Sequence, residues 1–473
     1  MNEIQMLGEE YCIGEFGDQR LCKVGKLLYS RMMKRGTVCI RQLADNRATQ
    51  KRFDRLLEHP DVTPQEIIRH GSSRTATAAA GRHVLAIQDT SELDYSAHRQ
   101  RTAGLGKISN HKGAGLFIHP VLAVDADSGD CLGIAHLQGW VRTKTAARNY
   151  ERLPIEEKES YRWLQAAQVA GQCLEQAAEV TVIADRESDL YEEWDRIPDG
   201  HTHLLTRAHF NRKLADGGTL SERLAAQPAV ACYTLAVPAR AAGRAYKSTD
   251  GARSGRVTAH DAHMEVRFGR VHITRPQHCR AQQSDIALSV VDVLELPSTV
   301  APGEKPVHWR LLSTHRVDDV QGALQLVDWY RQRWQIEQLF RTLKRQGLDM
   351  EASQLEDADA LLKLVSVAVL VAARTLQLVN ARDGQSQQRV SDAFDDDEIT
   401  MLGQLQDKLE GKTDKQKNLH PIHSMAWAAW TIARLGGWMG YASEAKPGPI
   451  TMLHGLQRFD SMVQGWKLAK MWA

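Results

Sequence analysis

The chain has 473 residues, and its 60 Lys and Arg nearly balance its 58 Asp and Glu, so a net charge of +2 gives no overall field that would by itself hold nucleic acid. Seven scattered cysteines without a Cys-x2-Cys pair favour a reducing cytosol and argue against a zinc site. The lack of a continuous apolar stretch of about 18 residues, and of a signal-peptide pattern, predicts a cytoplasmic protein without membrane contact.

Residues 1–75 are predicted to form a helical DNA-binding domain. Helical spacing runs over 21–33, Gly36 is placed to end that helix, and a second helix is expected over 46–57. From Lys23 to Arg52 nine bases are accompanied by one acid, Asp45, which is typical of a DNA-binding arm. A soluble basic helix surface is the alternative. The bases are Lys23, Lys26, Arg31, Lys34, Arg35, Arg41, Arg47, Lys51 and Arg52.

Residues 76–199 are predicted to begin an α/β core. Two short, β-rich apolar runs, 83–88 and 180–184, are followed directly by Asp89 and Asp185. An acid at the C-terminal end of a buried strand lies at the rim of the sheet, where α/β proteins place ligand sites. Either aspartate alone would also suit an N-cap or a turn.

Between these two runs the pattern predicts a hairpin and a helix. Strands are expected over 116–124 and 131–137, joined by a turn-rich connection, and a helix is expected over 156–178. Beyond the second run, Glu187 and Asp189 could support Asp185, or they could be ordinary exposed acids after a strand. The order strand, hairpin, helix, strand suits several α/β folds.

Residues 200–315 are predicted to form a β-rich insertion. Residues 264–268 alternate with period two, and 286–296 is strongly β-forming. Trp309 lies in the last expected strand, where an ordinary core position is the alternative to a functional one. The loops of the insertion are basic, with Arg207, His209, Arg212, Lys213, Arg240, Arg244, Lys247 and Arg253.

Residues 316–380 are predicted to contain a helix with a charged strip. At about 100° per residue, five side chains fall within an arc of roughly 80°, beside an apolar stripe. One carboxylate among cations suits a metal and phosphate site, whereas the alternative is a solvated face with pairs such as Glu337–Arg341. The strip consists of Tyr330, Arg333, Glu337, Arg341 and Lys344. A following helix, 358–378, is apolar almost all round and is expected to be buried.

Residues 381–473 are predicted to be helical after an acidic segment, 392–398. Aromatic and Met residues are frequent here, which suits a protein interface, although packing against the chain's own core is the default. These residues are Met425, Trp427, Trp430, Trp438, Trp466 and Trp472.

Taken together, these segments resemble a known family, the bacterial DDE transposases with an RNase H-like core, and within it the insertion-sequence branch with the signature Tyr-x2-Arg-x3-Glu-x6-Lys. The strip from Tyr330 to Lys344 matches that signature at every spacing, and Asp89-Thr90 and Asp185-Arg186-Glu187 match the two aspartate motifs. The stretches 104–107, 158–163 and 432–438 also look like family landmarks. Ser91 and Glu92 depart from the hydroxyl residues expected after the first aspartate.

The resemblance implies an α/β fold: an RNase H-like catalytic core (76–199 and 316–380) with a β-rich insertion (200–315), flanked by a helical DNA-binding domain (1–75) and a helical C-terminal dimerisation region (381–473). It also implies a catalytic and metal-binding triad of Asp89, Asp185 and Glu337. Two Mg²⁺ ions, replaceable by Mn²⁺, are expected there, with Asp185 bridging them. The implied DNA-binding residues are Tyr330, Arg333, Arg341, Lys344, Arg207, Trp309 and Trp334, with Trp309 stacking on a flipped-out base.

The function implied by the resemblance is cut-and-paste DNA transposition: metal-dependent hydrolysis at transposon ends, formation of a hairpin, and strand transfer into target DNA. The expected partners are double-stranded DNA, as transposon ends and as target, and a second copy of the chain in the DNA complex. Three alternatives stay open. They are an RNase H-like nuclease that does not join DNA, a non-catalytic end-binding or inhibitory protein, and another α/β enzyme in which the three carboxylates do not meet.

Overall fold

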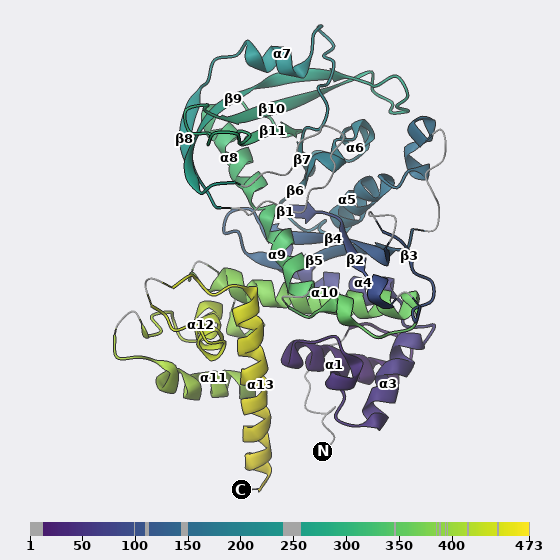
Figure 1. Cartoon of the computed structure of the whole chain (residues 1–473), viewed down its shortest axis with the longest axis vertical. Coiled ribbons are helices and arrows are strands. Elements are labelled where there is room, and N and C mark those ends of the chain that lie inside the picture. Colours follow the sequence, from purple (N-terminus) through teal and green to yellow (C-terminus); the bar gives the residue numbers. More distant parts are fainter. Residues whose placement is uncertain are drawn as a thin grey trace. The chain divides into compact units, whose positions relative to one another are not determined.

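The computed structural model describes residues 13–98, 100–108, 113–142, 150–239, 257–344, 347–384, 386, 389–392, 394, 396–413, 416–441 and 444–472 (Figure 1). The chain divides into two compact units. The first comprises Met1–Ala147, Gln165–Val180 and Trp334–Ala473, and the second comprises Arg148–Leu164 and Thr181–Arg333. The division into five regions made from the sequence stays a prediction.

The N-terminal part of the first unit is helical, as predicted. Its helices are α1 (Gln19–Arg35), α2 (Ile40–Leu43), α3 (Arg47–Glu58) and α4 (Pro64–Ala79). Gly36 ends α1 in the left-handed region, at φ 56°, where its N–H bonds to the carbonyl of Met32. Asn46 caps α3 by accepting a hydrogen bond from the Thr49 N–H. Both predicted helix ends are therefore confirmed.

The strands of the first unit are antiparallel and centre on β4. They are β1 (His83–Gln88), β2 (Ser91–Asp94), β3 (Gly106–Lys107), β4 (Ala114–Asp125) and β5 (Cys131–Trp140). β4 pairs with each of the other four. The predicted hairpin is confirmed, because β4 and β5 are joined by a short turn in which the Asp125 carboxylate accepts the N–H groups of Asp127 and Ser128.

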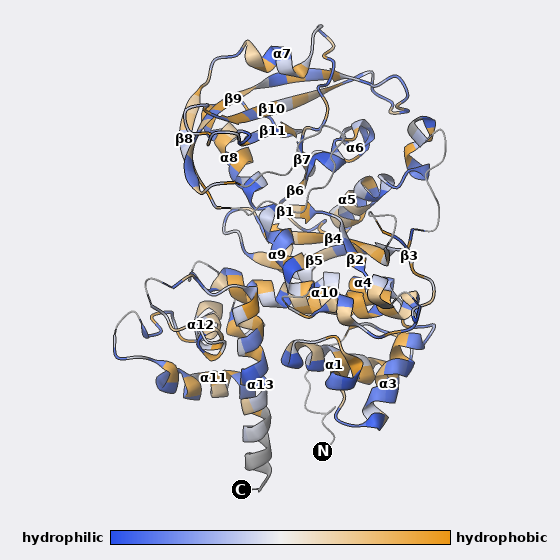
Figure 2. Ribbon diagram, viewed as in Figure 1, coloured by the Kyte–Doolittle hydropathy of each residue, from blue (hydrophilic) through white to orange (hydrophobic). Residues whose placement is uncertain are grey.

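Two long helices of the first unit pack on β5 and on each other. They are α4 and α10 (Ala358–Ala381), and α10 also packs on α9 (Trp334–Leu343). Hydrophobic residues, orange in Figure 2, occupy much of α10 and of the strands. Among the described helices, α10 alone is long and apolar enough to cross a membrane. However, 83% of its most apolar 18-residue segment is buried inside the protein, as in a helix of a protein core. The predicted burial of 358–378 is confirmed.

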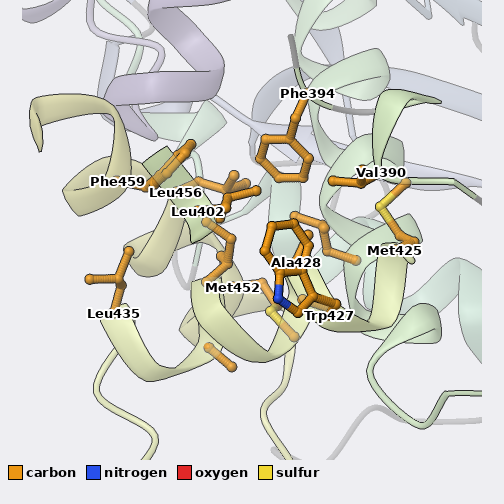
Figure 3. Close-up of a cluster of buried hydrophobic side chains, with 14 of the residues drawn as sticks. Val390, Phe394, Leu402, Met425, Trp427, Ala428, Leu435, Met452, Leu456 and Phe459 are labelled. Atoms are coloured by element: carbon orange, nitrogen blue, oxygen red, sulfur yellow. The ribbon is translucent and has the colours of Figure 1, made fainter. Parts of the chain in front are cut away.

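The C-terminal helices surround a core of their own. They are α11 (Asp396–Leu409), α12 (Met425–Leu435) and α13 (Pro449–Trp472). Met425, Trp427 and Phe459 lie in a buried cluster that Figure 3 shows. Met425, Trp427 and Phe459 therefore pack inside the protein, and a role of this region in dimerisation stays a prediction. The 432–438 motif closes α12 against α13, because a Cβ at Gly436 would come within 2.0 Å of the Thr451 carbonyl oxygen.

The second unit is β-rich between its helices, as predicted for the insertion. Its strands run in the order β6-β7-β11-β10-β9-β8, and α8 packs on β9 and β10. Arg240, Arg244, Lys247 and Arg253 lie outside the described residues. The elements are β6 (Glu179–Ala184), α6 (Tyr191–Arg196), β7 (Thr202–Arg207), α7 (Leu220–Ala225), β8 (Ala231–Val237), β9 (His260–Thr274), β10 (Asp285–Glu295), β11 (His308–Ser313) and α8 (Val320–Arg331).

The remaining helical elements are short. The helix predicted over 156–178 is confined to α5 (Tyr161–Cys173), because the N–H of Lys158 turns back to the Ile155 carbonyl and keeps the preceding residues in a separate turn. The 3-10 helices are η3 (Ser96–His98), η4 (Tyr150–Arg152), η5 (Ile155–Glu157), η6 (Arg186–Ser188), η7 (Met350–Ala352) and η8 (Val390–Asp392).

One prediction is wrong: the charged strip does not lie on a single helix. α8 ends at Arg331 and α9 begins at Trp334; between them the N–H of Arg333 bonds to the Tyr330 carbonyl, in a tighter turn. The reason lies in burial. Tyr330 is buried in α8 and Leu339 is buried in α9, but nine residues at about 100° each would put them on opposite sides of one helix.

Candidate functional site

Several predicted site residues gather around Tyr330 in the second unit. Tyr330 ends α8 on its buried side and is 5% exposed. Burial raises the pKa of its phenol, the charges of Arg333 and Arg207 lower it, and the carboxylate of Asp185 raises it; the net shift is upward. Side chains from three separate parts of the chain, Arg333, Arg207 and Asp185, thus lie within electrostatic reach of the Tyr330 phenol. The phenol stays protonated and can donate a hydrogen bond at neutral pH.

Arg207 and Trp309 are held together by the pairing of β7 with β11. Leu311 is the register partner of Arg207 in this antiparallel pair. The Arg207 Nη2 donates a 2.7 Å hydrogen bond to the carbonyl of His308, the residue before Trp309. The Trp309 ring centroid lies 6.1 Å from that of Tyr330, with the planes tilted by 59°. Trp309 is half-buried, so it is not an enclosed core residue.

Asp185 follows β6, as predicted, and it is half-buried. Its Oδ1 accepts a 2.8 Å hydrogen bond from the Glu187 N–H, which makes it the N-cap of the short helix η6. The capping role given above as an alternative is therefore real. It occupies one carboxylate oxygen; within the described residues the other oxygen makes no hydrogen bond.

Of the two acids that follow Asp185, Glu187 is exposed, as one of the two alternatives required, but Asp189 is not. Glu187 is exposed and pairs with Arg162 at 2.9 Å, which gives the 158–163 landmark a contact with the second aspartate motif. Asp189, in contrast, is fully buried and forms an ion pair with Arg212 at 2.6 Å. The interpretation of Asp189 as an exposed acid is wrong, because its partner lies in a loop that the local sequence does not reveal.

In the first unit, Asp89 follows β1 at the predicted strand end. The Thr90 N–H donates to Asp89 Oδ1 at 2.7 Å, and the Thr90 hydroxyl is hydrogen-bonded to His119 Nδ1 at 2.8 Å. The other ring nitrogen of His119, itself fully buried, bonds to Gln88 at 3.1 Å. Since His119 belongs to β4, this chain of bonds ties the side chains of the two residues that flank Asp89 to the neighbouring strand.

The other predicted residues of the first unit lie on or beside α9. Glu337 and Lys344 are half-buried, and Arg341 is exposed. Trp334 is 56% exposed, which excludes a core position within its unit. The helix is anchored by Gln335, whose Nε2 donates to the carbonyl of Gly129 in the β4–β5 turn at 2.9 Å.

The structure therefore brings together Asp185, Arg207, Trp309, Tyr330 and Arg333 in the second unit. Asp89, Trp334, Glu337, Arg341 and Lys344 belong to the first unit. Because the triad is divided between the units, the meeting of its three carboxylates stays a prediction. Sequence reasoning did not foresee the ion pairs of Arg162 and Arg212, because these pairs depend on acids 25 and 23 residues away.

The N-terminal basic block is partly neutralised inside the fold. Arg31 and Arg35 both bind Asp45, and Lys34 binds Asp460 at 2.9 Å. The hydrogen bond from Arg31, with that from Arg35, lowers the pKa of Asp45 to about 2. Exposed bases remain on α3 and near it: Lys23, Arg41, Arg47, Lys51 and Arg52.

Comparisons with known proteins bear on this site. Residues 164–372, less than half of the chain, match the family model described as Transposase DDE domain. The matched range contains Asp185, Glu337 and the Tyr330 cluster, and it leaves out Asp89. A solved structure, a cryo-EM structure of a piggyBac transposase synaptic complex with hairpin DNA, is similar over 97% of this chain and 80% of that chain, with 10% identity and a TM-score of 0.37. A likeness this distant assigns neither fold nor function.

Proposed function

We propose that this protein is a DNA transposase that hydrolyses phosphodiester bonds at transposon ends and joins them to target DNA. The observation that carries the proposal is the gathering of Asp185, Arg207, Trp309, Tyr330 and Arg333, from four separate elements, inside the matched transposase domain. A carboxylate, two cations and a partly exposed aromatic surface are what a cut DNA strand requires: a metal ligand, phosphate contacts and a surface for a base.

We further propose an RNase H-like core in which Asp89, Asp185 and Glu337 hold two Mg²⁺ ions, with Mn²⁺ as a substitute. All three are hard oxygen donors of the kind that Mg²⁺ prefers. Asp185 fits this role, because the hydrogen bond to Glu187 orients its carboxylate while its second oxygen stays open within the described residues. When bound, such ions activate an oxygen nucleophile and stabilise the leaving oxygen.

The side chains of the cluster would bind the strand on either side of the cut bond. Arg207 donates to a neutral carbonyl and forms no ion pair within the described residues, so its charge is available to a phosphate. Because Tyr330 is buried, its protonated hydroxyl serves to position Arg333 rather than to offer an open surface. Arg341 and Lys344 extend the phosphate contacts from the α9 region, and Trp309 and Trp334 offer surfaces for unpaired bases.

The reaction needs no covalent protein intermediate. Water attacks first and frees a 3′-hydroxyl, which then attacks either the opposite strand, giving a hairpin, or the target DNA. We propose that the protein works in the cytoplasm on double-stranded DNA, as a homodimer in the DNA complex.

The experiment that tests the function is incubation of the full chain with Mg²⁺ and the DNA flanking its gene. A released fragment with sealed ends, followed by strand-transfer products from a 3′-hydroxyl donor, is the expected result. Replacement of Asp89, Asp185 or Glu337 by Ala should abolish cleavage and leave end-binding largely intact. Cleavage without joining would favour a nuclease, and binding without cleavage would favour an inhibitory end-binding protein.

A further inference from the structure

The loop after β7, residues 209–213, is tied to a fully buried carboxylate. Asp189 Oδ2 accepts the backbone N–H groups of His209 at 2.7 Å and of Phe210 at 2.9 Å. Its Oδ1 accepts two N–H groups of Arg212, at 3.2 and 2.6 Å. An ionised carboxylate that accepts four hydrogen bonds in the interior holds its donors firmly, because each would be left unpaired if the loop moved.

The guanidinium of Arg212 packs between two aromatic rings, one of which belongs to the loop. It is nearly buried, with the Trp194 ring centroid at 5.2 Å and the Phe210 ring centroid at 4.8 Å. Arg212 also donates to the backbone carbonyl of Asp189, which joins the loop to the segment that begins at Asp185. Phe210 is therefore fixed twice, through its backbone by Asp189 and through its ring by a cation.

Despite this fixation, Phe210 is 54% exposed. An aromatic ring that is ordered and open has already lost the conformational freedom that binding would otherwise remove, so it is a low-entropy contact surface. Covering Arg212 alone does not require an aromatic ring, since an aliphatic side chain would also exclude water from one side of the guanidinium.

The surroundings of Phe210 favour a polyanion. His209, Asn211 and Lys213 are exposed, Arg207 lies two residues before the loop begins, and no acid occurs from 207 to 215. The His209 ring meets Phe210 edge-on, with 4.6 Å between centroids. Bases flanking an exposed aromatic ring are the arrangement by which proteins bind single strands, with phosphates on the cations and a base on the ring.

We propose that Phe210 is a stacking surface for an unpaired nucleobase of the DNA strand bound beside Asp185, and that Asp189 and Arg212 are positioning residues for it. This inference rests on the proposed function, since it requires that the protein binds DNA. It adds a base contact distinct from Trp309, carried by a different loop.

The test uses the full chain and DNA duplexes with the sequence that flanks the gene. Each duplex carries one unpaired 2-aminopurine near its end, and the binding buffer contains Ca²⁺. Stacking quenches the fluorescence of 2-aminopurine. We expect quenching at one position with the wild type and with Phe210→Tyr, and its loss with Phe210→Leu, which retains an apolar cover over Arg212. Binding of that duplex should weaken about tenfold in Phe210→Leu, the scale of a lost base–aromatic stack.

Two further variants separate positioning from general stability. Asp189→Asn keeps the shape but weakens the anchor, and it should reduce the quenching and speed hydrogen exchange of the His209 and Phe210 amides. The matched control is Asp216→Asn, which breaks an exposed ion pair with Arg223 in the same connection and should change neither readout. If the wild type binds DNA and Phe210→Leu quenches like it, the stacking role is wrong. If the wild type binds no DNA, the proposed function fails as well.

Discussion

Arginines in two regions of the molecule differ in how their charge is used. In the N-terminal helices, Arg31 and Arg35 converge on one carboxylate, Asp45, so both guanidinium groups share an acidic partner within the fold and one of the two charges is neutralised. Beside Tyr330, Arg207 donates to the neutral carbonyl of His308 and forms no ion pair among the described residues. The first arrangement stabilises the helices, whereas the second leaves a cation without an acidic partner among the described residues. Counting bases along the sequence cannot separate the two.

The largest expected effect belongs to the acid of the second region. Asp185→Asn can still accept the Glu187 N–H, so the η6 turn should survive, but the negative charge is lost. We expect cleavage to fall about a thousandfold or more, with end-binding within about twofold, in single-turnover and equilibrium binding assays. Glu187→Gln, which breaks an exposed ion pair with Arg162, is the control and should cleave normally. Equal losses in both variants would mean that the turn, and not the carboxylate charge, matters.

The next effect tests whether the charge of Arg207 is available. Arg207→Met should slow cleavage about 100-fold, the scale of a lost preorganised donor, and reduce the salt dependence of DNA binding by about one unit of slope. Arg267→Met is a matched control from the same set of strands, because Arg267 is already paired with Glu265 at 2.6 Å. Its salt slope should equal that of the wild type. A lower slope for Arg267→Met as well would contradict the distinction between used and available cations.

The features predicted correctly from the sequence are those determined locally. Asp89 and Asp185 lie at strand ends because short β-rich runs precede them, and Gly36 ends α1 because few other residues adopt its positive φ. The break in the helix between Tyr330 and Trp334 was missed, because residue spacing alone cannot show that α8 and α9 bury side chains that would lie on opposite sides of one continuous helix. The buried state of Asp189 was missed because it depends on Arg212 in another loop.

The same limit applies to the candidate site. That Asp185, Arg207 and Tyr330 lie together follows from the neighbouring positions of β6 and β7 in the sheet and from the packing of α8, none of which has a local signal. Only the family resemblance connected these residues in advance. The basic block illustrates the opposite case: its composition was read correctly, but three of its bases are occupied by acids.

A smaller effect, on stability, is expected when the Arg31–Asp45 contact of the N-terminal helices is removed. Arg31→Met removes two hydrogen bonds from a nearly buried guanidinium to Asp45 and should lower the free energy of unfolding by about 2 kcal/mol, measured by urea denaturation. DNA binding by the folded variant should be unchanged. Lys51→Met, which alters an exposed base on α3, should do the reverse and weaken DNA binding without loss of stability. Weaker binding in Arg31→Met at full folding would show that this cation also serves DNA.

The smallest effect is a pH dependence that should belong to the first region. The pKa of Asp45 is lowered from 3.8 to about 2, chiefly by its hydrogen bond from Arg31. A carboxyl whose pKa is lower in the folded state contributes stability above the unfolded value and loses it as the pH falls through the folded one. Asp45→Asn should therefore be less stable than the wild type at pH 6, and the difference should shrink between about pH 4 and pH 2. Urea denaturation of both proteins at several pH values measures this difference in stability. A difference that stayed constant to about pH 2 would mean that Asp45 acts by shape rather than by charge, and that it does not form ion pairs with Arg31 and Arg35.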